Sequence, residues 1–108
     1  SGLSLPPACP LCGGVLRPDV VLFGEMLPTH ALDRLQTILA GGLDAVVSIG
    51  TTSVFPYIAG PVWWAQQYGI AVVEINPGDT EVSHLASVRL RMGAAQAMQE
   101  IWGRLHPA

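Results

Sequence analysis

The two cysteines of this 108-residue sequence lie close together, in the segment Cys9-Pro10-Leu11-Cys12, and two glycines follow them. Two thiolates on a tight turn, with glycines that let backbone N–H groups face the sulfurs, are typical of a zinc knuckle. A structural zinc takes four protein ligands, and none of the histidines stands at a ligand-like spacing from this pair. The sequence therefore predicts half of a zinc site, completed from elsewhere. A redox-active pair is the alternative, disfavoured because no strand of a βαβ unit precedes it.

A second group of polar residues follows an apolar run, in the segment Gly50-Thr51-Thr52-Ser53. Its glycine allows close approach of the backbone, and its hydroxyls stand just before an expected helix. Such a loop suits an anionic or polyhydroxyl ligand such as a nucleotide. Asn76, in Asn76-Pro77-Gly78, could bind a ribose. Taken by spacing alone, both segments are more simply ordinary turns, because glycine, serine, threonine and asparagine are favoured there.

Other polar residues form no catalytic arrangement in the sequence. Glu25 follows Gly24 as a lone carboxylate, for which a solvated loop position is the simplest interpretation. None of the histidines has a neighbouring serine, cysteine or aspartate that would suggest a nucleophile and its base. We therefore predict no catalytic residue in this chain.

The elements that would position these groups alternate between strands and helices. Short apolar runs predict buried strands, and amphipathic stretches predict helices between them. The expected strands are 19–23, 45–49, 70–75 and a short 87–91, and the expected helices are 28–41, 56–68, with a break at Gly60-Pro61, and 92–105. This alternation indicates an α/β fold, a Rossmann-like parallel sheet with flanking helices. The chain would form half of a doubly wound nucleotide-binding domain, together with half of a small zinc-knuckle module.

Composition and charge limit the partners that the chain can take. Half of the residues are apolar and only 12% are charged, which excludes disorder and suggests that some apolar surface meets a second domain. The net charge is −3 and all five basic residues are arginines, so we expect neither nucleic acid nor a membrane surface as a partner. No apolar run reaches the roughly 20 residues of a membrane span, and no signal peptide is visible. We expect a soluble protein of the cytoplasm.

The order of these segments resembles the sirtuin family, the NAD-dependent protein-lysine deacylases. The matching segments are Cys9-Pro10-Leu11-Cys12-Gly13-Gly14, then Leu16-Arg17-Pro18-Asp19-Val20-Val21-Leu22-Phe23-Gly24-Glu25, then Gly50-Thr51-Thr52-Ser53, then Glu74-Ile75-Asn76. The resemblance covers nearly the whole chain, but only the second half of the family's catalytic domain. It implies residues 1–18 as the second half of a zinc-binding module with a linker, and residues 19–108 as part of the NAD-binding domain.

The resemblance also implies a role for each matching position. Cys9 and Cys12 would be two of four cysteine ligands of a structural Zn²⁺. The segment with Val21, Phe23, Gly24 and Glu25 would pair with the acyl-lysine peptide in the manner of an added strand. NAD would contact Gly50, Thr51, Thr52 and the adjacent Ser53, its adenosine ribose Asn76, and its adenine the segment that ends at Ala95.

Two departures from the family pattern limit what this chain would do by itself. The segment between Gly50 and Pro56 is one residue shorter than is usual. The family's first half is also missing, with its phosphate loop, its first cysteine pair and its catalytic histidine. We therefore expect deacylation of acyl-lysine proteins only when an N-terminal half joins this chain. The alternatives are a nucleotide or ADP-ribose binder without catalysis, and an interaction fragment that stabilises a partner through its apolar face and Trp63-Trp64.

Overall fold

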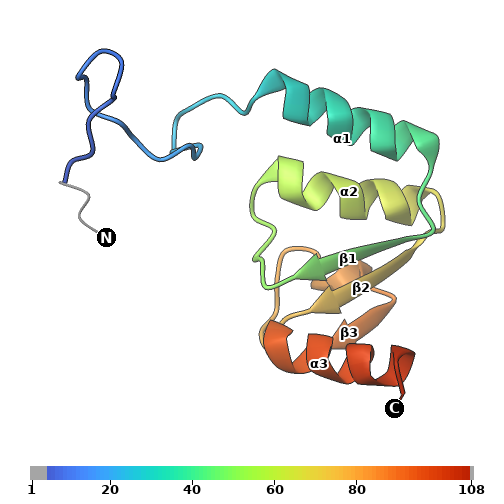
Figure 1. The fold of residues 1–108 in the computed structure, drawn as a ribbon. Helices are drawn as coiled ribbons and strands as arrows, with labels where there is room; N and C mark the ends of the chain where they lie inside the picture. Colours follow the sequence, from blue (N-terminus) through green and yellow to red (C-terminus); the bar gives the residue numbers. More distant parts are fainter. Residues whose placement is uncertain (1–4, 108) are drawn as a thin grey trace. The chain divides into compact units, whose positions relative to one another are not determined.

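A computed structural model describes residues 5–107 of the chain, which divides into two compact units, residues 1–34 and 35–108. The elements follow in the order α1 (Thr29–Gly41), β1 (Ala45–Ile49), α2 (Pro56–Gln67), β2 (Ala71–Ile75), a 3-10 turn η1 (Ser83–Leu85), β3 (Val88–Leu90) and α3 (Ala94–Leu105) (Figure 1). The expected alternation of strands and helices from residue 45 onward is confirmed.

The second unit contains a parallel sheet with strand order β1-β2-β3. Ala45 pairs with Ala71 at one end of β1 and Ile49 pairs with Ile75 at the other. Parallel neighbours need a crossover between them, and α2 supplies it for β1 and β2. Their carboxyl ends consequently lie at the same edge of the sheet, which is where ligands bind in such folds.

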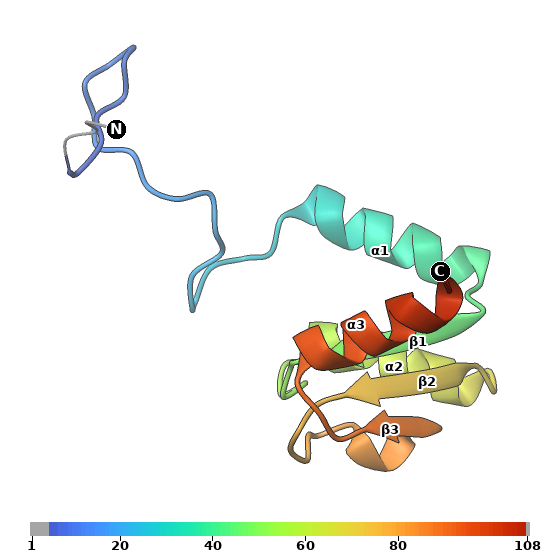
Figure 2. The same cartoon turned by 60° about the horizontal axis from the view of Figure 1, so that its bottom comes forward.

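Helices α2 and α3 lie on opposite faces of this sheet (Figures 1 and 2). The core on the α2 face is formed by small and β-branched residues that let the helix approach the strands closely. Its buried members are Ala59, Val62 and Ala65 of α2, Val72 of β2, and Val82 beside η1. Full burial of one valine side chain stabilises the fold by about 1.5–3 kcal/mol. The Rossmann-like half-domain is therefore the observed fold.

Helix α2 runs without interruption through Gly60 and Pro61, so the expected break is wrong. Pro61 lacks the N–H that would bond to the carbonyl one turn earlier, which costs the helix one hydrogen bond. The buried face on both sides of it, Ala59 and Val62, holds the helix against the sheet. Packing outweighs the local defect at this position.

Residues 19–23 do not form the expected buried strand. Val20, Val21 and Leu22 are about half exposed, and Phe23 is 93% exposed. Two turns shape this segment instead, because Val20 N–H donates to the Pro18 carbonyl and Glu25 N–H to the Leu22 carbonyl. A strand needs a neighbouring strand, and the described residues form no strand beside this run. The segment is a loop, and its apolar side chains are exposed.

Across residues 5–107, every helix is too short or too polar to cross a membrane.

Candidate functional site

The cysteine pair lies on a closed hairpin in the first unit. Cys9 N–H donates to the Gly14 carbonyl at 2.7 Å, and Gly13 N–H donates to the Cys9 carbonyl at 2.9 Å. A bridge between Ala8 and Val15 closes the base of the hairpin. Gly13 has a φ of 73°, a left-handed conformation that glycine adopts without steric cost. The turn therefore holds both thiols on one knuckle.

The chemistry of this knuckle fits a zinc ion. Hydrogen bonds from the backbone of Leu11, then from the backbone and thiol of Cys12, lower the pKa of the Cys9 thiol. They favour the thiolate, which is the form that binds a metal. Both cysteines are free, and no third histidine, cysteine or carboxylate joins them within the described part of the chain. A structural zinc takes four protein ligands, of which this knuckle would supply two.

Glu25 does not stand as a lone carboxylate on the following loop. Arg17 binds it with both terminal guanidinium nitrogens, Nη1 at 2.6 Å from Oε1 and Nη2 at 3.1 Å from Oε2. The same arginine donates to the Val20 carbonyl at 2.8 Å, and Leu22 N–H donates to Glu25 Oε2 at 2.9 Å. The hydrogen bonds from Arg17 and then from Leu22 lower the pKa of Glu25. This pair closes the loop of residues 18–25 and fixes its shape.

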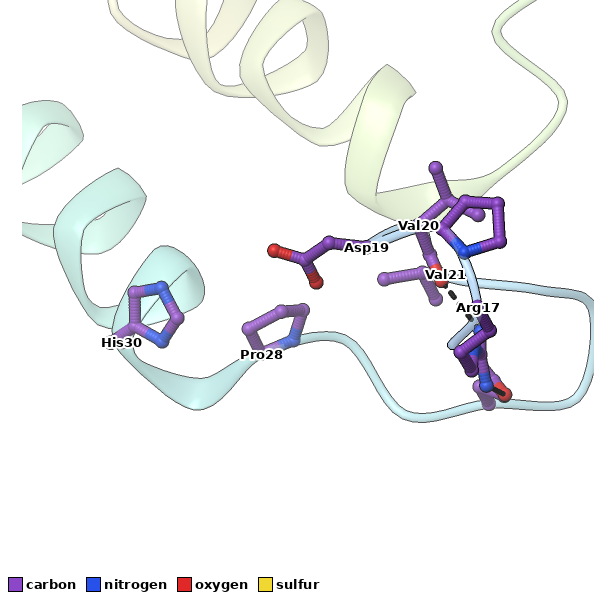
Figure 3. A pocket seen from close by; sticks show the side chains of 8 residues that line it. Arg17, Asp19, Val20, Val21, Pro28 and His30 are labelled. Carbon is purple, nitrogen blue, oxygen red and sulfur yellow. Dashed lines mark hydrogen bonds and ion pairs between the residues drawn. The ribbon is translucent and has the colours of Figure 1, made fainter. Parts of the chain in front are cut away.

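An open hollow of about 540 Å³ lies beside this loop (Figure 3). Residues 17–30 provide its whole lining, which includes Arg17, Val20 and Val21. In Figure 3 the Asp19 carboxylate points toward the side where Pro28 and His30 lie. His30 and Asp19 also line the hollow. Neither was a candidate site residue, because neither stands in a recognisable catalytic spacing.

The segment after β1 forms a strained and organised loop in the second unit. Gly50 and Ser53 both have left-handed backbones, with φ of 64° and 56°. For serine this conformation is uncommon and costs energy, and such positions cluster at ligand sites. Ser53 is 2% exposed, and its Oγ is buried without a hydrogen-bond partner among the described residues. A buried hydroxyl without a partner, in a loop at the carboxyl edge of the sheet, fits a binding site for a polar ligand.

Asn76 is linked directly to this loop. Its Nδ2 donates to the Thr51 carbonyl at 3.2 Å, and its Oδ1 accepts from Gly78 N–H at 3.0 Å. Its backbone N–H donates to the Leu90 carbonyl at the end of β3. The structure therefore brings Asn76 and Thr51 together, although 25 residues separate them in the sequence.

Ala95 lies at the start of α3, one residue after the helix begins. The helix follows β3 and therefore starts at the same carboxyl edge of the sheet. Ala95 is exposed there, and the helix is preceded by Gly93 in an extended conformation. The residues expected to bind the nucleotide thus lie along one edge of the sheet in the second unit.

A buried acidic residue lies next to this edge and was missed as a functional candidate. Glu74 on β2 is 1% exposed and accepts hydrogen bonds from Ser83 Oγ, Thr80 Oγ1 and Arg89 Nε. Burial alone raises the pKa of this carboxyl, but the bonds from Ser83, Thr80 and Arg89 outweigh it and lower the pKa. A single charged residue inside the apolar run 70–75 is the feature of the sequence that could have identified Glu74 as a candidate.

The sequence is similar to a known family and to curated proteins. The Sir2 family model matches residues 3–56. A protein from Pseudomonas aeruginosa named NAD-dependent protein deacylase 2 is 46% identical over 102 residues, which are 94% of this chain and 40% of that protein. Its namesake from Pseudomonas syringae pv. tomato is 54% identical over 97 residues, 90% of this chain and 39% of that protein. The chain thus spans about 40% of the length of these relatives.

Solved structures of Sir2 homologues are also similar to this chain. A Sir2 homologue in complex with NAD is 37% identical, with a TM-score of 0.80 over 92% of this chain and 38% of that one. A mutant Sir2 homologue in complex with ADP-ribose is 35% identical, with a TM-score of 0.82 over 97% of this chain and 42% of that one. The resemblance to sirtuins is confirmed. Because the family model alone matches half of the sequence, this chain belongs to the Sir2 family.

Proposed function

We propose that this chain is the C-terminal part of an NAD-dependent protein-lysine deacylase. The observation that carries the proposal is the hydrogen bond from Asn76 to the Thr51 carbonyl, which joins two loops that match the family at the carboxyl edge of the sheet. The names of the two Pseudomonas relatives support it. So does the family likeness to the homologue solved with NAD.

The residues proposed to hold NAD are those of the second unit's carboxyl edge. They are Gly50, Thr51, Thr52, Ser53, Asn76 and Ala95. NAD supplies the ADP-ribose that accepts the acyl group, and nicotinamide leaves. Gly50 allows a close approach of the backbone, and the buried Ser53 hydroxyl gains the partner that the free loop does not provide. Asn76 would hold the ribose through its side-chain amide.

The proposed peptide site is the loop that Arg17 and Glu25 close. Val21, Phe23 and Gly24 would offer backbone groups to the acyl-lysine substrate, which binds as an added strand. Glu25 would act by fixing this loop, because its carboxylate already binds Arg17 and Leu22 N–H. Residues 19–23 have the apolar, β-branched pattern of a strand but lie outside the strands of the described chain, which supports a segment that forms a strand with the substrate.

A zinc-binding module is proposed around Cys9 and Cys12. Residues 1–18 would form its second half and the linker, and residues 19–108 would belong to the NAD-binding domain. The other two ligands, the phosphate loop and the catalytic histidine would come from an N-terminal half. Val47 and Ile49 of β1 point to the same face of the sheet and are 53% and 40% exposed, which supports a neighbour that packs on this face. Two unpaired thiols fit a cytoplasmic location.

The test is to join the N-terminal portion of the Pseudomonas aeruginosa relative to residues 1–108 of this chain, hereafter the joined protein. We expect it to remove acetyl groups from lysine peptides only with NAD, and to release nicotinamide and O-acetyl-ADP-ribose in equal amounts by mass spectrometry. A folded joined protein that consumes no NAD would contradict the proposal. Tight binding of ADP-ribose by that inactive protein would indicate a non-catalytic nucleotide binder instead.

A further inference from the structure

We infer that the buried Glu74 carboxylate is a positioning group for the nucleotide loops and acts on them through Thr80. The inference rests on the proposed function and deepens it, because it names what fixes the proposed NAD site. Glu74 itself is on β2 and does not reach the loops directly; the segment 76–83 lies between.

Glu74 is the shared acceptor of three donors. Its Oε1 accepts from Ser83 Oγ at 2.6 Å and from Arg89 Nε at 3.1 Å, and its Oε2 accepts from Thr80 Oγ1. The two hydroxyls also accept, since Thr80 N–H donates to Ser83 Oγ at 2.8 Å and Val82 N–H donates to Thr80 Oγ1 at 3.3 Å. Each hydroxyl proton is therefore available to Glu74, and a carboxylate satisfies all three donors where an amide would satisfy fewer.

Arg89 holds the same segment from its other side. It is the cross-strand partner of Glu74 in the β2–β3 register, so its side chain lies beside the Glu74 carboxylate. From there its Nη2 donates to the Gly78 carbonyl at 3.3 Å and to Asp79 Oδ1 at 2.7 Å. The turn after Asn76 is consequently fixed at Gly78 and Asp79 as well as at Thr80.

Two hydrogen bonds connect the segment 76–83 to the proposed NAD loop, residues 50–53. Glu81 N–H donates to the Thr52 carbonyl at 3.1 Å, and Asn76 Nδ2 donates to the Thr51 carbonyl at 3.2 Å. Glu81 directly follows Thr80, so a shift of Thr80 moves the amide that holds Thr52. The segment between Glu74 and Ser83 thus contacts two consecutive carbonyls of the loop that ends at Ser53.

A buried ionic cluster could instead serve stability alone. The two roles differ in what they change. Loss of a contact that only stabilises the fold lowers the melting temperature and leaves both KM values unchanged. Loss of a contact that positions the site raises the KM for NAD and leaves the KM for the peptide unchanged. Thr80 is the residue to vary, because it is the direct neighbour of the amide that binds Thr52.

The test compares Thr80→Val with Thr80→Ser in the joined protein. Valine keeps the shape of threonine and removes the hydroxyl, whereas serine restores the hydroxyl. We expect Thr80→Val to raise the KM for NAD about three- to tenfold, the range for one lost hydrogen bond, with the peptide KM unchanged. Thr80→Ser should return the KM for NAD to within about twofold of the parent. Amide hydrogen exchange at Thr52 and Ser53 should speed up in the valine variant only.

A fall in melting temperature with an unchanged KM for NAD, and unchanged exchange at residues 50–53, would overturn the inference. Equal effects of the valine and serine variants would also overturn it, because they would make the hydroxyl irrelevant. Failure of the proposed function is seen separately, as a parent joined protein that consumes no NAD. Even then the exchange measurement decides whether Thr80 orders the loop.

Discussion

Ser53 is the residue whose conformation is hardest to explain by folding alone. It has a left-handed backbone, and its buried Oγ has no partner within the described chain. An unsatisfied buried hydroxyl costs about 1–3 kcal/mol, and a non-glycine residue in the left-handed region adds about 1–2 kcal/mol. A ligand that binds the hydroxyl offsets the first of these costs. Ser53 therefore connects the strain of the loop to its proposed function.

Replacing Ser53 by alanine separates the two costs. Ser53→Ala removes the orphaned hydroxyl and keeps the left-handed backbone, so we expect the joined protein without nucleotide to gain about 1 kcal/mol of stability. Its affinity for ADP-ribose should fall several-fold, because the ligand loses that hydrogen bond. Thermal unfolding and isothermal titration calorimetry measure the two effects. A loss of stability in the variant would mean that the hydroxyl already has a partner in the folded protein.

The strands and helices differ in how far local sequence determines them. Ala45–Ile49 and Ala71–Ile75 form as expected because each is a β-branched run closed by a glycine or a turn. Residues 19–23 have the same pattern and form a loop, since a strand also needs a partner that no local pattern contains. The hydrogen bond between Asn76 and Thr51 and the left-handed backbone of Ser53 depend on tertiary placement, so no local pattern in the sequence predicts them. Glu74 differs, because a charged residue in an apolar run is visible in the sequence.

The loop of residues 18–25 depends on the left-handed turn at Gly24. Its φ is 84°, and a Cβ there would meet no atom within 4 Å, so only the backbone conformation resists substitution. Gly24→Ala should cost about 1–2 kcal/mol in that conformation. We expect it to raise the peptide KM of the joined protein several-fold and to leave the KM for NAD unchanged.

Gly24→Asn provides the matched control for this element. Asparagine tolerates the left-handed region better than alanine does, because its side chain bonds to the local backbone. Steady-state kinetics should therefore rank the peptide KM as glycine lowest, asparagine next and alanine highest. Alanine and asparagine variants that both match the parent would show that the Gly24 turn does not shape the peptide site.

At the scale of the whole molecule, the proposed function requires an N-terminal half that completes the zinc site and the catalytic site. The Cys9–Cys12 knuckle has two thiols, and no further metal-binding group gathers around them in residues 5–107. We expect the joined protein to retain one zinc per chain after dialysis. Replacing Cys9 and Cys12 together by serine should abolish this retention and lower the melting temperature. Plasma emission spectrometry measures the metal.

The isolated chain provides the control for zinc. Two thiolates leave two coordination positions to water, and structural zinc takes much of its affinity from closure by four protein ligands. The chain alone should therefore lose its metal on dialysis. Stoichiometric zinc in a dialysed monomer of the isolated chain would contradict the half-site, and half a zinc per chain would indicate a dimer that shares one ion.

The central claim is that the carboxyl edge of the sheet binds the nucleotide, and amide chemical-shift mapping of the joined protein tests it most directly. ADP-ribose is titrated into protein labelled with ¹⁵N only in residues 1–108, which segmental ligation allows. We predict that the largest shifts fall on the amides of residues 50–53, Asn76 and Ala95, with small shifts at the Cys9–Cys12 knuckle. Saturable shifts that instead concentrate on residues 17–30, with residues 50–53 unmoved, would contradict this account.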